Sequence, residues 1–544
     1  MKIKDLVLPA INQFASDYIS GRLKTDNFFH YDINDEKVFE KRYSELMNRH
    51  FYRKDLAEHI RQYMDPFGIN ESVRMNIEAL EREDSVVVIG GQQAGLLSGP
   101  LYTIHKALSV IKLAERQAKA LNKKVIPVFW IAGEDHDIQE VNHVYMMHNS
   151  KPDKVSFPMY ITKKPMVSDV KLEYAAAMSW VEKIIESYGE TNYTNDLLKN
   201  VSKLVEESDN FSDFFARLMH TWFKESGLLL LDAADPKLRK LESEYFTRMI
   251  KNADLITNAV ISQQNLVEAE GYKKAIDIGS NAANIFYYDA ENQERTLLEL
   301  NGSGDFIADK SDSLSFTQTD MLHMAETRPE CLSNNVVTRP IMQESLFPVL
   351  AFIAGPGEAA YWAELKQAFE LFEMKMPPIV PRMNLTIVER SIETDLNELG
   401  LDLEAALTGK TKEALQQYLE SIKDETLVQL HQQLIQNVDR SHAAFSEQAL
   451  MIDESLKPLL IKNREFIRKQ LDFIYEKTDE MNRRKHEIVI NKYERVSASL
   501  YPLNSPQERI WNPFYYLNKY GPDFIKELAR LEYEFNNKHK AILL

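Results

Sequence analysis

The segment from Gly90 to Lys106 holds side chains that could bind a small charged molecule. Its two neighbouring glutamines, Gln92 and Gln93, offer amides that can hydrogen-bond a polar ligand. At its end, His105 and Lys106 can offset the charge of a phosphate or a carboxylate, and we predict catalytic roles for both. The residues of this segment that we expect to bind substrate are Gly91, Gln92, Gln93, Gly99 and Tyr102.

A second segment places Glu134, Asp135 and His136 next to one another. The two carboxylates can hold an amine, and the imidazole can transfer a proton, so we predict that all three are catalytic. A metal site is the alternative, because Glu140 and His143 have the i, i+3 spacing of a carboxylate-type ligand pair. No second pair of this kind follows, and we predict no bound metal.

The local pattern of hydrophobic residues predicts how these two segments are positioned. Val86–Ile89 and Val125–Ile131 are dense in β-branched residues, which is typical of buried parallel strands. Between them, apolar residues recur at helical spacing from Tyr102 onward. The strand–helix–strand order predicts a parallel βαβ unit, in which ligands bind beyond the carboxyl ends of the strands.

The glycines of the first segment precede a predicted helix, whose N-terminus is suited to an anion. They match neither G-x-G-x-x-G nor a loop ending in Gly-Lys-Ser/Thr, so a standard dinucleotide or P-loop site is not indicated. A later turn, Gly355-Pro-Gly-Glu358, precedes another predicted helix, and we expect Gly357 and Glu358 to bind substrate as well.

The composition limits the class of protein. The 544 residues carry 65 basic and 82 acidic side chains, and this net charge of −17 argues against nucleic acid as a partner. Cys331 is the single cysteine, which excludes an intrachain disulfide and a cysteine-based zinc site. No apolar run approaches the roughly 20 residues of a membrane helix, and the start lacks the apolar stretch of a signal peptide. We therefore expect a cytoplasmic protein without a membrane partner.

The sequence predicts three regions. Residues 1–390 form an α/β, Rossmann-like core, interrupted by insertions at about 144–225 and 240–335. In the second insertion, Ala275–Gly279 and Ala283–Tyr288 are expected to be antiparallel strands. Residues 391–500 are expected to be helical, and 501–544 form a tail that packs back on the core.

The helical region carries a heptad repeat, in which one position is apolar throughout. This pattern is typical of an antiparallel helical hairpin or of a coiled coil that forms a dimer. The residues at this position are Leu460, Ile467, Ile474, Met481 and Ile488.

The tail is rich in aromatic residues that could stack on a nucleotide base, although aromatic residues more often serve packing. The residues that we predict to bind a nucleotide are Arg509, Trp511 and Asn512.

Three motifs together resemble the bacillithiol biosynthesis cysteine-adding enzymes of Firmicutes, and the resemblance spans essentially the whole chain. The motifs are Gly90–Lys106, Phe129–Asp137 with Glu140–His143, and Gly355–Trp362. The resemblance implies a Rossmann-like core similar to class I aminoacyl-tRNA synthetases, connecting insertions and a coiled-coil domain that forms a homodimer. It also implies that the carboxyl group of L-cysteine is joined to the amino group of glucosaminyl malate. The paired-histidine and lysine-rich signatures of those synthetases are absent here.

Amide formation from a free carboxylate is unfavourable in water, so we expect activation by ATP or another adenine nucleotide. In this hypothesis the Gly90–Lys106 segment and its two cationic side chains bind the phosphate. Glu134 and Asp135 hold the amine, and His136 takes its proton. Two other functions are open: a non-enzymatic nucleotide-binding scaffold with a coiled-coil arm, and a metal-dependent hydrolase.

Overall fold

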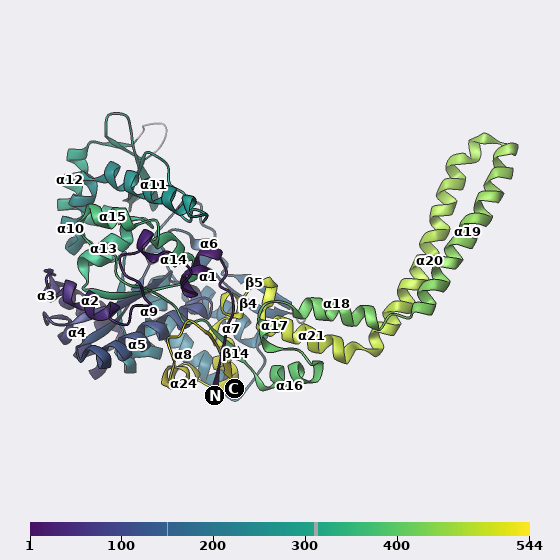
Figure 1. Ribbon diagram of the computed structural model, residues 1–544, viewed down its shortest axis with the longest axis horizontal. Coiled ribbons are helices and arrows are strands. Elements are labelled where there is room, and N and C mark those ends of the chain that lie inside the picture. Colours follow the sequence, from purple (N-terminus) through teal and green to yellow (C-terminus); the bar gives the residue numbers. More distant parts are fainter. Residues whose placement is uncertain (149–150, 309–313) are drawn as a thin grey trace. The chain divides into compact units, whose positions relative to one another are not determined.

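The computed structural model of the protein describes residues 1–148, 151–308 and 314–544 (Figure 1). These residues form two compact units. The larger unit contains residues 3–386 and 507–542, and the smaller contains residues 1–2, 387–506 and 543–544. Three of the four boundaries between the units fall within β1 (Lys2–Leu6), β14 (Leu385–Val388) and β15 (His539–Leu543), and the fourth directly precedes Gln507.

A five-stranded parallel sheet forms the centre of the larger unit, and this confirms the predicted Rossmann-like core. Its strand order is β13-β12-β2-β3-β6, and every neighbouring pair is parallel. The apolar runs of the sequence are fully buried in it, with Val86 to Ile89 all at 0% exposure. The strands are β2 (Val86–Gln92), β3 (Val125–Ile131), β6 (Leu229–Asp232), β12 (Val349–Ala354) and β13 (Ile379–Pro381).

Helices surround this sheet. The crossover from β2 to β3 is α5 (Tyr102–Leu121), which packs against both strands as the βαβ prediction requires. Before the sheet come α1 (Gln13–Ile19), α2 (Val38–Leu46), α3 (Arg53–Met64) and α4 (Glu71–Leu80). Around and after β12 come α13 (Thr338–Leu346), α14 (Pro356–Trp362) and α15 (Lys366–Leu371), and the tail adds α22 (Gln507–Ile510), α23 (Pro513–Tyr520) and α24 (Phe524–Arg530).

The first inserted region follows β3. It contains α6 (Ile138–Val141), the antiparallel pair β4 (His143–His148) and β5 (Lys151–Ser156), and the helices α7 (Tyr174–Ser187), α8 (Thr194–Glu206) and α9 (Phe211–Phe223).

The second inserted region contains α10 (Pro236–Lys251), α11 (Ala253–Ala269), α12 (Gln318–Thr327) and an antiparallel sheet in the order β10-β9-β8-β7-β11. The strands are β7 (Ala282–Asp289), β8 (Glu294–Leu300), β9 (Phe306–Ile307), β10 (Ser315–Phe316) and β11 (Leu332–Asn334).

One strand predicted in this insertion is wrong. Residues 275–279 form no strand, because the backbone N–H groups of Ala275 and Ile276 donate to the carboxylate of Glu364 instead of to a neighbouring strand. The second predicted strand is confirmed as β7, and its partners are β8 and β11.

The smaller unit is helical. Two long helices, α19 (Glu425–Ile452) and α20 (Lys457–Lys485), lie side by side as an antiparallel hairpin (Figure 1), and no residue of either is buried. The shorter helices are α16 (Arg390–Leu399), α17 (Leu403–Leu407), α18 (Thr411–Ser421) and α21 (Glu487–Leu500). Among the described residues, no helix is both long and apolar enough to cross a membrane.

Candidate active site

A cavity of about 340 Å³ lies beyond the carboxyl ends of four neighbouring strands of the parallel sheet. Gln92 ends β2, Ala132 follows β3, Gly355 follows β12 and Arg382 follows β13, and all four residues line the cavity. A parallel α/β sheet offers its ligand site at this edge, so the cavity is the candidate active site of the larger unit.

Most of the residues that the sequence predicts for a site meet in this cavity. Those that line it are Gly91, Gln92, Gln93, Tyr102, Lys106, Asp135, Gly357, Glu358 and Arg509. Those that do not line it are Gly99, His105, Glu134, His136, Trp511 and Asn512.

Lys106 reaches the cavity from α5 with its ammonium group fully hydrogen-bonded. Its Nζ donates to the carbonyl of Gly91 at 2.7 Å, to Gln92 Oε1 at 3.3 Å and to Glu358 Oε2 at 2.5 Å. Glu358 Oε2 also accepts from the backbone N–H of Gly355 at 2.6 Å. Lys106 therefore ties the end of β2 to the start of α14, and burial lowers its pKa despite the contact with Glu358.

Asp135 presents a carboxylate to the cavity. Gln93 Nε2 donates to its Oδ2 at 2.8 Å, and the backbone N–H of His136 donates to its Oδ1 at 2.9 Å. Burial opposes ionisation of Asp135, but the hydrogen bond from Gln93 and the positive charges of Arg339 and Arg295 outweigh it, so the pKa of Asp135 is lowered.

Three arginines line the cavity, and they differ in the contacts that their guanidinium groups make. Arg382 makes two hydrogen bonds to Glu508, at 2.6 and 2.7 Å. Arg509 lies over the ring of Tyr102, 6.0 Å from its centroid. Among the described residues, neither the Arg339 nor the Arg509 guanidinium has a hydrogen bond or an ion pair, so both can bind an anionic ligand.

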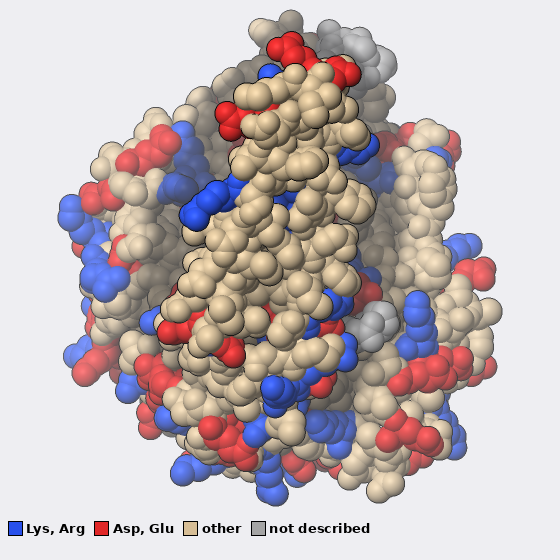
Figure 2. All heavy atoms as spheres, turned by 90° about the vertical axis from the view of Figure 1, so that its right-hand side faces the viewer, with Lys and Arg blue, Asp and Glu red and all other residues tan. Residues whose placement is uncertain are grey.

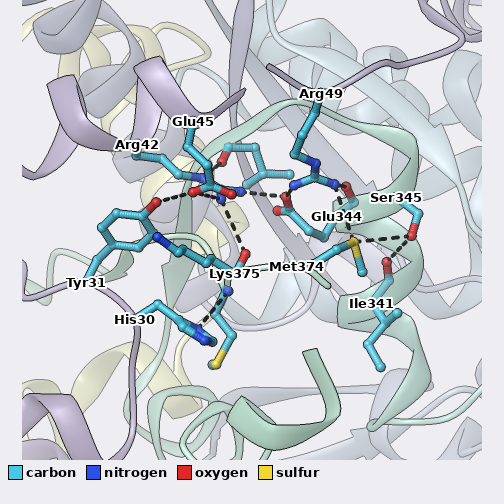
Figure 3. A network of polar contacts seen from close by, with 12 residues as sticks. His30, Tyr31, Arg42, Glu45, Arg49, Ile341, Glu344, Ser345, Met374 and Lys375 are labelled. Carbon is cyan, nitrogen blue, oxygen red and sulfur yellow. Dashed lines mark hydrogen bonds and ion pairs between the residues drawn. The ribbon is translucent and has the colours of Figure 1, made fainter. Parts of the chain in front are cut away.

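The helix that carries Arg339, α13, is anchored by a network of polar contacts around Glu344 (Figure 3). Glu344 of α13 is 1% exposed and accepts hydrogen bonds from Arg42, at 2.5 Å, and from Arg49. The second nitrogen of Arg49 donates to the backbone carbonyl of Glu344 at 2.9 Å, and Arg42 also donates to the carbonyl of Val349 at 2.9 Å. This network fixes α13 against the N-terminal segment and so holds Arg339 at the cavity.

His105 is 1% exposed and does not line the cavity. Its Nδ1 lies 2.8 Å from Glu508 Oε2, the carboxylate that also binds Arg382. Burial lowers the pKa of His105, although the contact with Glu508 opposes this. In this arrangement His105 joins α5 to the tail.

The other two predicted catalytic residues, buried Glu134 and half-buried His136, are bound by other side chains of the protein. Glu134 is 1% exposed and binds Arg239 of α10 and the backbone N–H of Asn334. His136 Nδ1 lies 2.9 Å from Arg295 of β8.

The tail meets the backbone at the N-terminal end of α5. The side chain of Asn512 donates to the carbonyls of Leu97 and Gly99 at 2.9 and 2.8 Å. The backbone N–H of Leu101 donates to the carbonyl of Trp511 at 2.9 Å. Gly99 has φ +69°, a conformation that favours glycine, and its carbonyl is bound to the tail.

Sequence reasoning missed several residues of the cavity wall, chiefly Arg339, Gln343, Tyr361 and Arg382. Arg382 had a usable signal, because it ends the run Pro377–Arg382, whose pattern predicts a strand, as Glu134 and Asp135 follow another. Arg339 lies in the first turn of a helix, and no local pattern distinguishes it from a surface arginine. Over the described residues, no three His, Cys, Asp or Glu side chains gather in a geometry that could hold a metal ion.

Comparisons with known proteins place both units in one family. Residues 1–383 match the family model described as the N-terminal Rossmann-like domain of bacillithiol biosynthesis BshC, and residues 385–544 match that of its C-terminal coiled-coil domain. The chain is 43% identical over its whole length to a protein of Geobacillus sp. (strain WCH70) and 41% identical to one of Geobacillus thermodenitrificans, each named putative cysteine ligase BshC and each covered completely. A protein of Bacillus cytotoxicus with the same name is 40% identical, again over the full length of both chains. The parallel-sheet core, the helical hairpin and these matches together show that the chain belongs to the BshC family of bacillithiol biosynthesis.

Proposed function

We propose that the protein is a ligase that joins the carboxyl group of L-cysteine to the amino group of glucosaminyl malate, which forms bacillithiol. The name of its full-length relatives, cysteine ligase, supports the formation of a C–N bond. The observation that carries the proposal is the cavity at the strand ends, which combines the carboxylate of Asp135 with guanidinium groups that have no hydrogen bond or ion pair to any described residue.

The charges in this cavity suit such an acceptor. The malate part of glucosaminyl malate carries carboxylates at neutral pH, and Arg339 and Arg509 can form charge-assisted hydrogen bonds with them. The amino group of the acceptor sugar requires a hydrogen-bond acceptor, and Asp135 lies in the same cavity.

ATP supplies the activation that an amide bond needs when it forms from a free carboxylate. The cavity wall contains four cationic side chains that fit phosphate oxygens. Lys106 and Arg382 form ion pairs with Glu358 and Glu508, whereas the guanidinium groups of Arg339 and Arg509 form none with the residues that the structure describes. Within the chain, Arg339 and Arg509 would orient the anionic substrates, and Asp135 would receive the proton that the attacking amine releases.

The direct test is to incubate the purified protein with cysteine, glucosaminyl malate and either ATP or no nucleotide. We expect bacillithiol, measured by mass spectrometry, only in the presence of ATP, together with stoichiometric ADP or AMP. Product formation at the same rate without ATP would refute the proposed activation. No product either with or without ATP would refute the ligase assignment.

We also propose that the helical hairpin forms a homodimer. Apolar side chains on it are open to solvent in the single chain: Phe445 is 68% exposed, Ile474 58% and Ile488, in the adjoining α21, 74%. Where the hairpin faces the viewer in Figure 2, its surface consists mainly of residues other than Lys, Arg, Asp and Glu. An exposed apolar face along a heptad repeat is typical of a coiled coil whose partner is a second chain.

A further inference from the structure

An arginine in the antiparallel sheet of the second inserted region contacts the loop that follows β3. Arg295 of β8 is 4% exposed and lies over the ring of Phe286, with its guanidinium carbon 3.7 Å from the centroid. Its Nε donates to Ser333 Oγ at 2.9 Å and its Nη2 to the carbonyl of Asn334 at 2.7 Å. These contacts fix the guanidinium, and its remaining nitrogen, Nη1, lies 2.9 Å from His136 Nδ1.

This contact determines which nitrogen of His136 carries the proton. A guanidinium has only donors and stays protonated in proteins, so the Nδ1 atom of His136 must accept. The imidazole is therefore neutral, with its proton on Nε2. Burial lowers the pKa of His136, and the positive charge of Arg295 adds to this effect. Lys164 acts in the same direction, whereas Asp135 and Asp137 of the same loop oppose it.

The basic lone pair of His136 is consequently occupied, and its other nitrogen can only donate a hydrogen bond. Asp135 is in the opposite situation, because it lines the cavity and its lowered pKa keeps it ionised, so that its carboxylate oxygens can only accept. Arg295 contributes to this as well, since its Nη1 lies 4.0 Å from Asp135 Oδ1. The backbone N–H of His136 also donates to that oxygen, at 2.9 Å, so the position of His136 helps to fix the carboxylate.

We propose that Arg295 is a positioning residue, which holds His136 as a neutral hydrogen-bond donor and leaves Asp135 as the proton acceptor for the attacking amine. This role rests on the function proposed above. The amine nitrogen forms a bond to the acyl carbon of the activated cysteine, and the bond from that carbon to the phosphate oxygen breaks. The electron pair of that bond leaves with the phosphate, and the proton on nitrogen moves to the Asp135 carboxylate.

The hold of Arg295 on His136 can be tested without any substrate. The protein is labelled with [13Cε1]-histidine, the His136 resonance is assigned by its loss in His136→Gln, and its titration is followed by NMR. In the wild type we expect its midpoint below that of a free histidine, and in Arg295→Met we expect the midpoint to rise. Arg328→Met, which removes an exposed arginine on the same inserted region, is the matched control and should leave the midpoint unchanged.

The other histidine resonances show whether each variant keeps its fold, and Arg295→Lys provides a milder substitution that retains the positive charge. An Arg295→Met protein that is folded but has an unchanged His136 midpoint would refute the proposed role of Arg295.

Steady-state kinetics test the consequence for the reaction. Asp135→Asn should lower kcat by at least about 100-fold, as expected for loss of a general base. Arg295→Met should lower kcat by about 10- to 100-fold through misplacement of the carboxylate, with KM values changed less than about threefold. Its kcat should also gain a dependence on pH as His136 begins to titrate.

The proposed ligase function and the proposed role of Arg295 can be refuted independently of each other. A wild-type protein that formed no bacillithiol would refute the ligase function, although the histidine titration would still decide whether Arg295 holds His136. An active Asp135→Asn protein beside an inactive His136→Gln protein would show that His136 is the base and would overturn the inference.

Discussion

Arg339 and Lys106 both bring a positive charge to the cavity, but they differ in their hydrogen bonds to the protein. Lys106 donates to three protein acceptors, among them Glu358 at 2.5 Å. The guanidinium of Arg339 has no hydrogen bond or ion pair in the part of the chain that the structure describes. A charged side chain whose donors are all hydrogen-bonded to the protein stabilises the fold. A charged side chain at a cavity whose donors have no protein acceptor is available to a ligand.

Substitution of Arg339 should therefore affect substrate binding more than stability. We expect Arg339→Gln to lower kcat/KM for glucosaminyl malate by about 10- to 150-fold, because hydrogen bonds to charged groups contribute about 1.5–3 kcal/mol. Arg339→Lys should recover part of this loss. The measurement is steady-state kinetics with glucosaminyl malate as the varied substrate.

Arg116 of α5 is exposed and does not line the cavity, so Arg116→Gln serves as the control that removes a positive charge elsewhere on the same unit. Equal kinetics of Arg339→Gln and this control would contradict the assignment of Arg339.

At the scale of elements, the buried contacts of Glu344 decide how firmly α13 is held. Glu344→Gln would remove the carboxylate that Arg42 and Arg49 share, and Arg42 would keep only its ion pair with Glu45 (Figure 3). Breaking a buried ion pair from one side costs about 3–5 kcal/mol, so we expect the unfolding free energy of the larger unit to fall by that amount. Urea denaturation followed by fluorescence measures it, and Glu330→Gln, at an exposed position, is the control. Coinciding transitions for the two variants would contradict this role of Glu344.

The end of β6 carries a carboxylate whose ionisation opposes folding. Burial raises the pKa of Asp232 to about 6, although hydrogen bonds from Ser168 and the backbone of Ala234 act against this. The folded protein therefore binds this proton more tightly than the unfolded chain, and stability is lost as the pH rises through about 6. The loss should approach about 3 kcal/mol at pH 8.

Asp232→Asn removes this dependence while it retains an oxygen for the hydrogen bonds. We expect the stability of the variant relative to the wild type to increase between pH 4 and pH 8, as measured by urea denaturation at a series of pH values. A difference that stays constant over this range would show that Asp232 remains ionised in the folded state.

The sequence predicted the parallel core because buried strands leave a strong signal: Val86–Ile89 and Val125–Ile131 are almost uninterrupted apolar runs. The signal of β8 was weak, because Glu294, Arg295 and Glu299 place charged side chains among its apolar ones. The strand that carries Arg295 was therefore not predicted. The strand-end rule brought Gln93 and Asp135 together correctly. It could not show that Glu134 turns to Arg239, because that contact joins residues 105 positions apart.

At the scale of the whole molecule, the exposed apolar face of the hairpin predicts the oligomeric state. We expect the wild type to be a dimer and the double variant Phe445→Glu, Phe466→Glu to be a monomer, because each charge would have to be buried at the interface. Light scattering coupled to gel filtration measures the mass directly. Gln448→Glu, at an exposed position of α19, is the control and should remain a dimer. A dimeric double variant would place the interface elsewhere.

The contacts of the tail also bear on how the chain is made. Asn512 binds the carbonyl of Leu97 across 415 positions of sequence, and Glu508 neutralises the buried Arg382. Because a ribosome releases the N-terminus first, the parallel sheet is synthesised well before the residues that complete its cavity wall. A chain terminated after Pro506 would retain Arg382 without its carboxylate and the α5 loop without Asn512. The positive charge of Arg382 is therefore compensated by a carboxylate that is synthesised 126 positions after it.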